Sequence, residues 1–339
     1  MHVGVMGAGS IGCFVGGSML AAHTANVTFV GRDRVAAEVA THGLRIQDFD
    51  RRRSVPPERV QFFTEAKALE RCDAVLVAVK SAQTVSVAKS LAAILRKGAL
   101  VVSLQNGVRN GEALREHLPN QIVVAAVVGF NVVSQGDGFF HRAMGKGLML
   151  EDRPEASALV AALKGAGLDV STHSDLAPHQ WTKLVVNLNN AVSALSNAPS
   201  RALLLQRGFR RTIVALIEEA LAVLGAAGIR AAPLRGVPVK LMPSILRLPT
   251  PLVRVVARAQ FRVNPEARSS MWEDLMRGRP TEVDFLNGEI VRLAAHVGVP
   301  APRNRRVVEL IKKAEAAGDG SPGLTAEALW HELHVGVSP

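Results

Sequence analysis

The chain begins with the stretch Met1-His2-Val3-Gly4-Val5-Met6-Gly7-Ala8-Gly9-Ser10-Ile11-Gly12. Its apolar first half predicts a β-strand, and the pattern G-x-G-x-x-G that follows opens a helical pattern over residues 11–22. In this context the first glycine makes a tight turn, the second lets a pyrophosphate approach the backbone, and the third lets helix and strand pack closely. The helix N-terminus then faces the phosphates. The alternative is a glycine-rich turn without a ligand, but the context favours a dinucleotide site formed by Gly7, Ala8, Gly9, Ser10, Ile11 and Gly12.

Short apolar runs and helical patterns alternate beyond this stretch. Strands are predicted at residues 1–6, 26–31, 74–79, 100–104 and 122–127, and helices at residues 11–22, 35–42, 84–95 and 111–118. This alternation predicts right-handed βαβ crossovers and an α/β fold with a Rossmann-type, doubly wound sheet. Glycine turns over residues 136–152 predict short antiparallel edge strands, and residues 168–173 predict the last strand.

The second half of the chain is predicted to be mostly helical. Helical periodicity is present at residues 177–197, 208–226, 270–276, 282–296 and 304–317. We therefore predict two domains, a Rossmann-like dinucleotide-binding domain over residues 1–174 and an all-helical substrate and catalytic domain over residues 175–339.

The end of the second predicted strand indicates which dinucleotide binds. NAD sites usually place an acid there to accept a hydrogen bond from the ribose 2′-hydroxyl. Here Arg32 occupies the region where a 2′-phosphate would lie, with Arg34 close by. The alternative is a surface arginine in an arginine-rich chain. The sequence favours NADP(H) over NAD.

Two lysines stand in apolar surroundings. Of the 40 basic residues only ten are lysines, and a partly buried lysine, unlike arginine, can shift its pKa and donate a proton. Lys80 ends an apolar run at the carboxyl edge of the predicted sheet, and Lys183 lies in an otherwise apolar helix. The alternative for each is a snorkelling lysine with its charge in water.

Lys183 also belongs to an unusual stripe on its predicted helix. Lys183, Asn187, Asn190 and Asn197 share one face, because their spacings are four, three and seven residues. Asparagine is a poor helix former, so the stripe favours the wall of a polar cleft over a solvated face. Further along, Thr281 and Asp284 match a capping box at the start of a helix. An acidic residue in a first helical turn is structurally favourable, so the sequence explains Glu282 equally well by a structural role and by a catalytic role.

The composition of the chain excludes some kinds of protein and leaves others open. The chain has 339 residues, of which 48% are hydrophobic, and its net charge of +11 leaves nucleic acid, a membrane surface and an anionic small molecule open as partners. Two cysteines exclude a disulfide framework, and the absence of tyrosine excludes a tyrosine acid or base. The most apolar stretch, residues 212–229, is interrupted by Glu218 and Glu219, so we expect no membrane span and a cytoplasmic location.

Motifs for other ligands are lacking. No zinc-finger, aromatic RNA-binding or helix-turn-helix signature is found, so no nucleic acid is expected. The run His331-Glu332-Leu333-His334 lacks the histidine spacing of a zinc site, and no metal is expected.

Taken together, several fragments resemble the ketopantoate reductase (2-dehydropantoate 2-reductase) family. The fragments occur in the family's order along nearly the whole chain: the glycine loop of residues 7–12, Arg32, Val79-Lys80-Ser81-Ala82-Gln83, Gln105-Asn106-Gly107, Trp181-Thr182-Lys183-Leu184 with Asn187, Ser269-Ser270-Met271, and residues 281–288. The resemblance implies NADPH-dependent reduction of 2-dehydropantoate to pantoate, on the route to pantothenate and coenzyme A.

The resemblance also implies roles for particular residues. Lys183 would be the general acid, and Glu282 would hold the substrate hydroxyl or nearby cofactor groups. Arg32 and Lys80 would contact NADP phosphates, and Asn106 would lie near the nicotinamide and the substrate. Asn187 and Ser270 would bind substrate, and Asn190 is the nearest substitute for a further family asparagine, because Ala191 occupies that position.

Two other functions stay open. One is an NADPH-dependent reductase of another bulky 2-oxo acid, and the other is a non-catalytic NADP-binding regulator. The partner expected is a small anionic 2-oxo acid, and a homodimer is left open. Residues 220–265 hold seven basic and no acidic residues, and solvated helix faces are favoured there over a basic flap or a contact surface.

Overall fold

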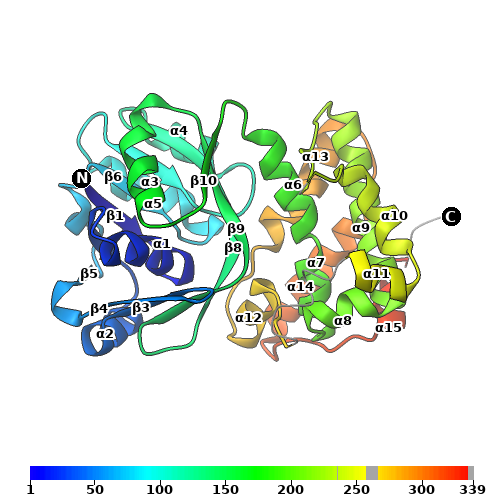
Figure 1. Ribbon diagram of the computed structural model, residues 1–339. Helices are drawn as coiled ribbons and strands as arrows, with labels where there is room; N and C mark the ends of the chain where they lie inside the picture. Colours follow the sequence, from blue (N-terminus) through cyan, green and yellow to red (C-terminus); the bar gives the residue numbers. More distant parts are fainter. Residues whose placement is uncertain (235, 257–265, 335–339) are drawn as a thin grey trace. The chain divides into compact units, whose positions relative to one another are not determined.

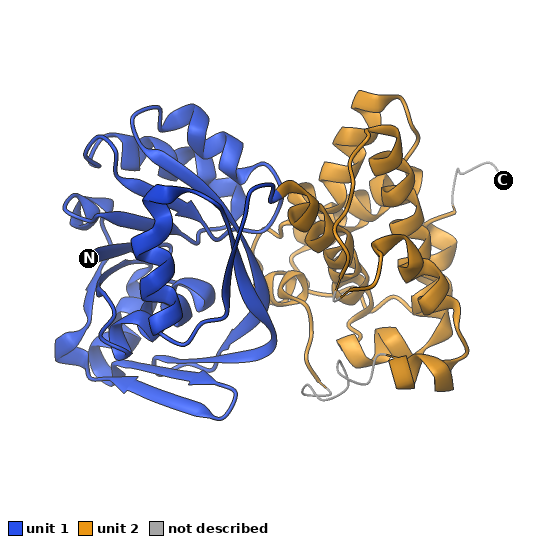
Figure 2. Ribbon diagram, turned by 45° about the horizontal axis from the view of Figure 1, so that its top comes forward, with its two compact units in different colours: residues 1–176 blue, residues 177–339 orange. Residues whose placement is uncertain are grey.

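A computed structural model describes residues 1–234, 236–256 and 266–334 of the chain. The chain divides into two compact units, Met1–Leu176 (unit 1) and Ala177–Pro339 (unit 2), drawn in two colours in Figure 2. Unit 1 is built on a β-sheet, and unit 2 is helical (Figure 1).

The described part of unit 1 contains a ten-stranded sheet in the order β4-β3-β9-β8-β7-β6-β1-β2-β5, with β10 paired to β9 outside this path. The strands β1, β2, β5, β6 and β7 are parallel, and β8 continues them in parallel with β7. The bounds are β1 His2–Met6, β2 Asn26–Val30, β3 Leu44–Asp48, β4 Arg51–Val55, β5 Gln61–Phe63, β6 Ala74–Val77, β7 Leu100–Ser103, β8 Ile122–Ser134, β9 Phe139–Glu151 and β10 Val170–His173.

Helices cover both faces of this sheet. One face packs against α1, α2 and α5 through side chains such as Phe14, Val39 and Leu159. The other packs against α3 and α4 through Leu91 and Leu114. The bounds are α1 Ser10–Ala21, α2 Asp33–His42, α3 Thr84–Ala92, α4 Asn110–His117 and α5 Ser157–Gly165, with short 3₁₀ turns η1 Pro57–Arg59, η2 Ala66–Leu69, η3 Ser81–Gln83 and η4 Pro154–Ala156. The α/β, doubly wound prediction is confirmed.

The topology gives this sheet a switch point. The strand β1 lies between β2 and β6, and the chain visits β2 before it crosses to β6 on the other side. Ligands of doubly wound sheets bind outside the carboxyl ends of the strands at such a point. The loops that follow β1 and β6 are therefore where a dinucleotide is expected.

The prediction of short antiparallel edge strands is wrong in length and in position. The strands β8 and β9 do pair in antiparallel fashion, but each spans 13 residues (Figure 1). The sequence did not predict the hairpin of β3 and β4. Its strand β3 pairs with the side of β9 opposite β8, so β4 ends the sheet at that side and β5 ends it at the other. The glycines in this region suggested strand ends. In the structure, Gly129 and Gly145 lie at a register shift between β8 and β9, where the two strands bend but stay paired.

Unit 2 is a set of packed helices around the buried helix α9. The bounds are α6 Ala177–Asn187, α7 Asn189–Ser196, α8 Ser200–Leu205, α9 Arg207–Ala226, α10 Met242–Arg247, α11 Thr250–Val256, α12 Ser270–Met276, α13 Asn287–Val297, α14 Pro302–Ala317 and α15 Ala326–Glu332, with 3₁₀ turns η5 Val239–Leu241 and η7 Val283–Phe285. No helix among the described residues is long and apolar enough to cross a membrane.

Two buried charges on α9 connect its neighbours. Arg210 is 1% exposed and donates hydrogen bonds to the main-chain carbonyls of residues 204, 205, 246 and 248, which end α8 and α10. The Glu219 carboxylate accepts from the main-chain N–H groups of Arg303 and Asn304, both at 2.9 Å, and so caps the start of α14.

The basic residues of 220–265 lie partly outside the described residues. Arg235, Arg258 and Arg262 are outside them, whereas Arg230, Lys240, Arg247 and Arg254 are exposed. Arg247 makes an ion pair of 2.6 Å with Glu218. Arg247 and Arg254 lie on α10 and α11, and their exposure agrees with solvated helix faces, whereas Arg230 lies outside the helices and Lys240 in η5.

Candidate functional site

The glycine loop joins β1 to α1 in a sharp turn. Gly7 has a φ of +96°, and the N–H groups of Gly7 and Ala8 both donate to the Val30 carbonyl at 2.9 Å. A Cβ atom on Gly7 would lie 2.6 Å from the main-chain nitrogen of Val79. Only glycine meets both demands, so the loop is held against the ends of β2 and β6.

Gly9 and Gly12 serve different purposes in this loop. A Cβ atom on Gly12 would lie 2.6 Å from the Gly7 carbonyl oxygen, which forces glycine there for packing alone. A Cβ atom on Gly9 would meet no atom within 4 Å, and its backbone is extended. The first hydrogen bond of α1 runs from Cys13 N to Gly9 O, so the N–H groups of Ser10, Ile11 and Gly12 have no acceptor within the helix. Open space beside Gly9 and oriented donors fit a dinucleotide pyrophosphate.

Arg32 lies next to this loop. Gly31 packs against the loop closely enough that a Cβ atom there would be 3.0 Å from Ala8 Cβ, and the exposed Arg32 follows as the residue before α2. Arg34, on α2, makes a surface ion pair with Glu38 of the same helix.

Lys80 and Asn106 lie at the carboxyl ends of adjacent strands. The strand β6 ends at Val77, two residues before the predicted end, and the half-buried Lys80 follows in the turn before η3. The Ser81 hydroxyl donates to the Asn106 carbonyl at 2.9 Å. The structure thus brings the glycine loop, Arg32, Lys80 and Asn106 to one edge of the sheet in unit 1.

Lys183 and Glu282, both in unit 2, interact electrostatically. Lys183 is half-buried on α6, and the Glu282 side chain is buried in the turn before η7. Burial lowers the pKa of Lys183 from an ordinary 10.5 to about 8, and the negative charge of Glu282 opposes part of that shift. An ammonium group with such a pKa is an effective proton donor near neutral pH.

The segment that carries Glu282 is not the helix start that the sequence predicted. The helix α13 begins only at Asn287, and residues 283–285 form a 3₁₀ turn. The predicted capping box is also wrong, because Thr281 Oγ1 accepts from Val283 N at 3.2 Å and Asp284 makes an ion pair of 2.6 Å with Lys312. The Thr281 N–H donates to Glu315 at 2.7 Å. Helix α14 therefore holds both sides of the turn in which Glu282 lies.

The predicted helix over residues 177–197 is broken at Leu188. The structure divides it into α6, which ends at Asn187, and α7, which begins at Asn189, although Leu188 between them keeps helical backbone angles (φ −57°, ψ −27°). The Asn189 side-chain amide donates to the Val186 carbonyl at this point. Asn187 and Asn190 are both half-buried on either side of this break. Asn197 ends α7 with a φ of +56° and accepts from the Trp272 indole at 2.8 Å, so this member of the stripe has a structural partner.

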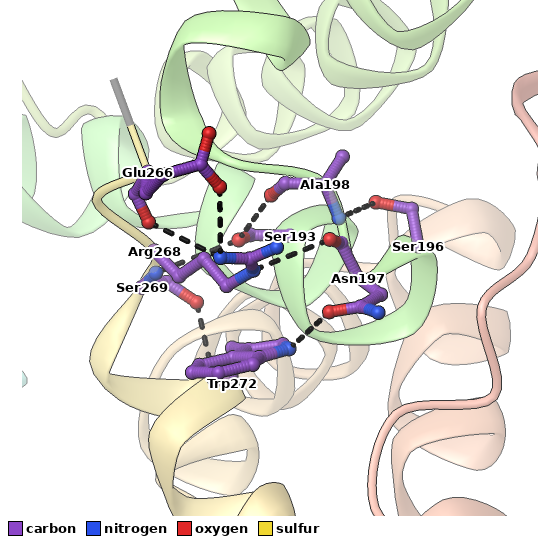
Figure 3. A network of polar contacts seen from close by, with 8 residues as sticks. All are labelled: Ser193, Ser196, Asn197, Ala198, Glu266, Arg268, Ser269 and Trp272. Carbon is purple, nitrogen blue, oxygen red and sulfur yellow. Dashed lines mark hydrogen bonds and ion pairs between the residues drawn. The ribbon is translucent and has the colours of Figure 1, made fainter.

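Ser270 is placed by contacts between α7 and α12. Ser269 precedes α12 as its N-cap, accepting from Trp272 N at 3.2 Å, and its hydroxyl donates to the Asn190 carbonyl at 3.0 Å. Figure 3 shows the adjoining contacts, in which Arg268 donates to the Asn197 carbonyl at 3.3 Å and lies over the Trp272 ring. The half-buried Ser270 therefore lies one residue from a direct contact with Asn190.

Some polar residues near these positions escaped the sequence analysis. Thr84 and Asn110, the first residues of α3 and α4, are buried beneath Lys80 and Asn106. Their polarity at two helix starts is an ordinary capping signal, so nothing in the sequence set them apart.

The doubly wound sheet with its glycine loop is the architecture of a dinucleotide-binding domain. Residues 3–154 match the family description "Ketopantoate reductase PanE/ApbA", and residues 175–315 match "Ketopantoate reductase PanE/ApbA C terminal". The chain belongs to the ketopantoate reductase family, and it is an oxidoreductase.

Individual relatives agree with this assignment. A 2-dehydropantoate 2-reductase of Halobacterium salinarum is 28% identical over 94% of this chain and 100% of its own length. The crystal structure of a PanE/ApbA family ketopantoate reductase from Ralstonia eutropha JMP134 is 32% identical, with a TM-score of 0.80 over 94% of this chain and 99% of that one. The fold is shared more widely: D-mandelate dehydrogenase with NADH and anilino(oxo)acetate is 18% identical, with a TM-score of 0.79 over 94% of this chain and 100% of that one.

Proposed function

We propose that this protein reduces 2-dehydropantoate to pantoate with NADPH, in pantothenate and coenzyme A biosynthesis. The names of its relatives support the substrate. The observation in this chain that carries the chemistry is the half-buried Lys183, whose pKa burial lowers and whose charge interacts with the buried Glu282. Reduction of a 2-oxo acid develops negative charge on the carbonyl oxygen and needs one proton there.

Unit 1 would hold the cofactor. The donors of residues 10–12 and the open space beside Gly9 fit the pyrophosphate, and the exposed guanidinium of Arg32 would pair with the 2′-phosphate. Lys80 would contact a cofactor phosphate, and Asn106 would orient the nicotinamide end. The chemistry supplied by bound NADPH is a hydride for C2 of the 2-oxo acid.

Lys183 would act as the general acid. Its ammonium group would stabilise the charge that develops on the carbonyl oxygen, then transfer a proton from Nζ to that oxygen and leave a neutral amine. Glu282 favours the protonated form of Lys183 and would accept a hydrogen bond from the substrate hydroxyl or from nearby cofactor groups. Such acid catalysis is typically worth about 10²–10⁴-fold.

The remaining polar residues of unit 2 would recognise the substrate. The Ser270 hydroxyl would donate to the substrate carboxylate, and the amides of Asn187 and Asn190 would donate to its carboxylate or hydroxyl oxygens. These three side chains are half-buried, which suits groups that exchange water for substrate.

The test follows NADPH oxidation with 2-dehydropantoate and with a panel of other 2-oxo acids. We expect 2-dehydropantoate to be the best substrate and Lys183→Ala to lower kcat by about 10²–10⁴-fold. Lys313→Ala, which removes an exposed lysine from α14, is the matched control and should leave kcat unchanged. Faster turnover of another 2-oxo acid would overturn the substrate but leave the role of Lys183 standing. A Lys183→Ala variant as active as Lys313→Ala would overturn the mechanism.

A further inference from the structure

Five polar side chains are buried together at the carboxyl edge of the sheet in unit 1. Ser81, Thr84, Ser103, Gln105 and Asn110 are each between 1% and 6% exposed. They come from the end of β7, from η3, and from the starts of α3 and α4. Buried polar groups are costly unless they are satisfied, so such a concentration at one sheet edge needs an explanation.

These side chains form one connected chain of hydrogen bonds. The Ser103 hydroxyl donates to Gln105 Oε1 at 3.1 Å, and Gln105 Nε2 donates to Thr84 Oγ1 at 2.7 Å. Thr84 Oγ1 lies 2.7 Å from Asn110 Oδ1 and 2.8 Å from the Ser81 carbonyl, and its single proton can serve either acceptor. Asn110 Nδ2 donates to Ser81 Oγ at 3.1 Å and also to the Asn106 carbonyl.

The chain of bonds ends on the main chain of Asn106. That carbonyl accepts from both Ser81 Oγ, at 2.9 Å, and Asn110 Nδ2. Gly107 then takes a φ of +91°, which fixes the direction of the turn. Since Ser81 directly follows Lys80, one hydroxyl links the turn that carries Lys80 to the turn that carries Asn106.

Packing alone does not require this arrangement. The neighbouring side chains of the sheet, such as Val77, Val101 and Leu91, hold the strands and α3 together through apolar contacts. Apolar residues of similar size could fill the same volume without the desolvation cost of five polar groups. A connected polar network instead favours one orientation of the groups it holds.

We propose that Ser81, Thr84, Gln105 and Asn110 are positioning residues that hold the Lys80 turn and the Asn106 turn in a fixed relation, so that both contact the same dinucleotide. The inference rests on the proposed function, because Lys80 and Asn106 are assigned to the cofactor there. The positioning residues act through the two turns and touch no reacting atom.

The test uses a matched pair of serine variants. Ser81→Ala removes the hydroxyl that links the two turns, whereas Ser18→Ala removes an equally buried hydroxyl that donates to Phe14 O within its own helix α1. We expect Ser81→Ala to weaken NADPH binding, measured by calorimetry, about tenfold and Ser18→Ala to leave it unchanged. Thr84→Val should also weaken binding, and Thr84→Ser, which keeps the hydroxyl, should restore it.

Binding and turnover separate this proposal from the proposed function. If the wild type binds NADPH but does not reduce 2-dehydropantoate, the proposed function fails and the binding comparison still decides this inference. A Ser81→Ala variant that loses stability but binds NADPH like Ser18→Ala would show a purely structural network and overturn the proposal. A wild type that binds no dinucleotide would overturn both.

Discussion

Raising the pH from 7 to 9 is the most direct perturbation of the Lys183–Glu282 pair. If Lys183 is the general acid, only its protonated form supports turnover, so kcat follows the protonated fraction. Burial depresses the pKa of Lys183 to about 8, which places the loss of the proton inside this range of pH.

The size of the effect follows from that pKa. With a pKa of about 8, roughly nine tenths of Lys183 is protonated at pH 7 and roughly one tenth at pH 9, so kcat should fall about tenfold. A lysine at the ordinary value of 10.5 would stay protonated through pH 9 and kcat would hardly change. Glu282 raises the pKa of Lys183, so Glu282→Gln should move the fall in kcat to lower pH.

The assay measures initial rates of NADPH oxidation at saturating 2-oxo acid, with the dinucleotide affinity measured at each pH. The thiols do not titrate in this range, because burial raises the pKa of both cysteines, that of Cys72 to about 11. The residual rate of Lys183→Ala should show no fall between pH 7 and 9. A wild-type kcat that is flat to pH 9, or a fall that persists without Lys183, would refute the assignment.

Three further predictions concern the cofactor site and stability. Gly9→Ala should change the free energy of unfolding by less than about 0.5 kcal/mol but weaken dinucleotide binding at least tenfold. Gly12→Ala should lower the free energy of unfolding by about 2–3 kcal/mol, because its Cβ meets the Gly7 carbonyl. Calorimetry measures binding and urea unfolding measures stability, and equal effects of the two variants would contradict the prediction. Arg32→Gln should lower kcat/KM for NADPH about 10–100-fold and leave kcat/KM for NADH nearly unchanged. Arg34→Gln, which changes an arginine that is ion-paired with Glu38, is the control. An equal loss of kcat/KM with both cofactors would exclude a 2′-phosphate contact. Arg210→Met should lower the free energy of unfolding by about 3 kcal/mol, since it leaves buried carbonyls without donors, and a change below 1 kcal/mol would contradict the role of Arg210 in joining α8 to α10.

The centre of the sheet in unit 1 could be predicted because its strands carry their own signal. Parallel strands buried on both faces are continuous apolar runs, and β1, β2, β6 and β7 all begin at or within one residue of the predicted positions. The glycine loop also carries its own local signal, since Gly7 is required by its positive φ and Gly12 by the close approach of the Gly7 carbonyl.

The outer part of the sheet could not be predicted, because its pairing is set by partners far along the chain. The strand β4 begins with Arg51-Arg52-Arg53, which looks like a charged loop, and β3 alternates only at Leu44 and Ile46. Their register comes from β9, some ninety residues later, to which β3 pairs at Phe139 and Phe140. Edge strands with one solvated face give a weak local pattern, and the glycines of β8 and β9 mark bends that a local analysis takes for ends.

In the candidate site of unit 2, the sequence indicated which residues matter but not where they lie. Residue type singled out Lys183 as a proton donor, and the pKa of about 8 agrees with that chemistry, although the assignment remains a prediction. The positions of these residues in the structure could not be predicted, because they depend on which hydrogen bonds form locally. Thr281 bonds to Val283 instead of capping a helix, and its N–H donates to Glu315, so that Glu282 sits in a turn held by α14. Residue type in an apolar helix named Lys183, and the family resemblance named Glu282. Neither signal predicted the electrostatic interaction between them, because the turn that carries Glu282 is positioned by tertiary contacts with α14.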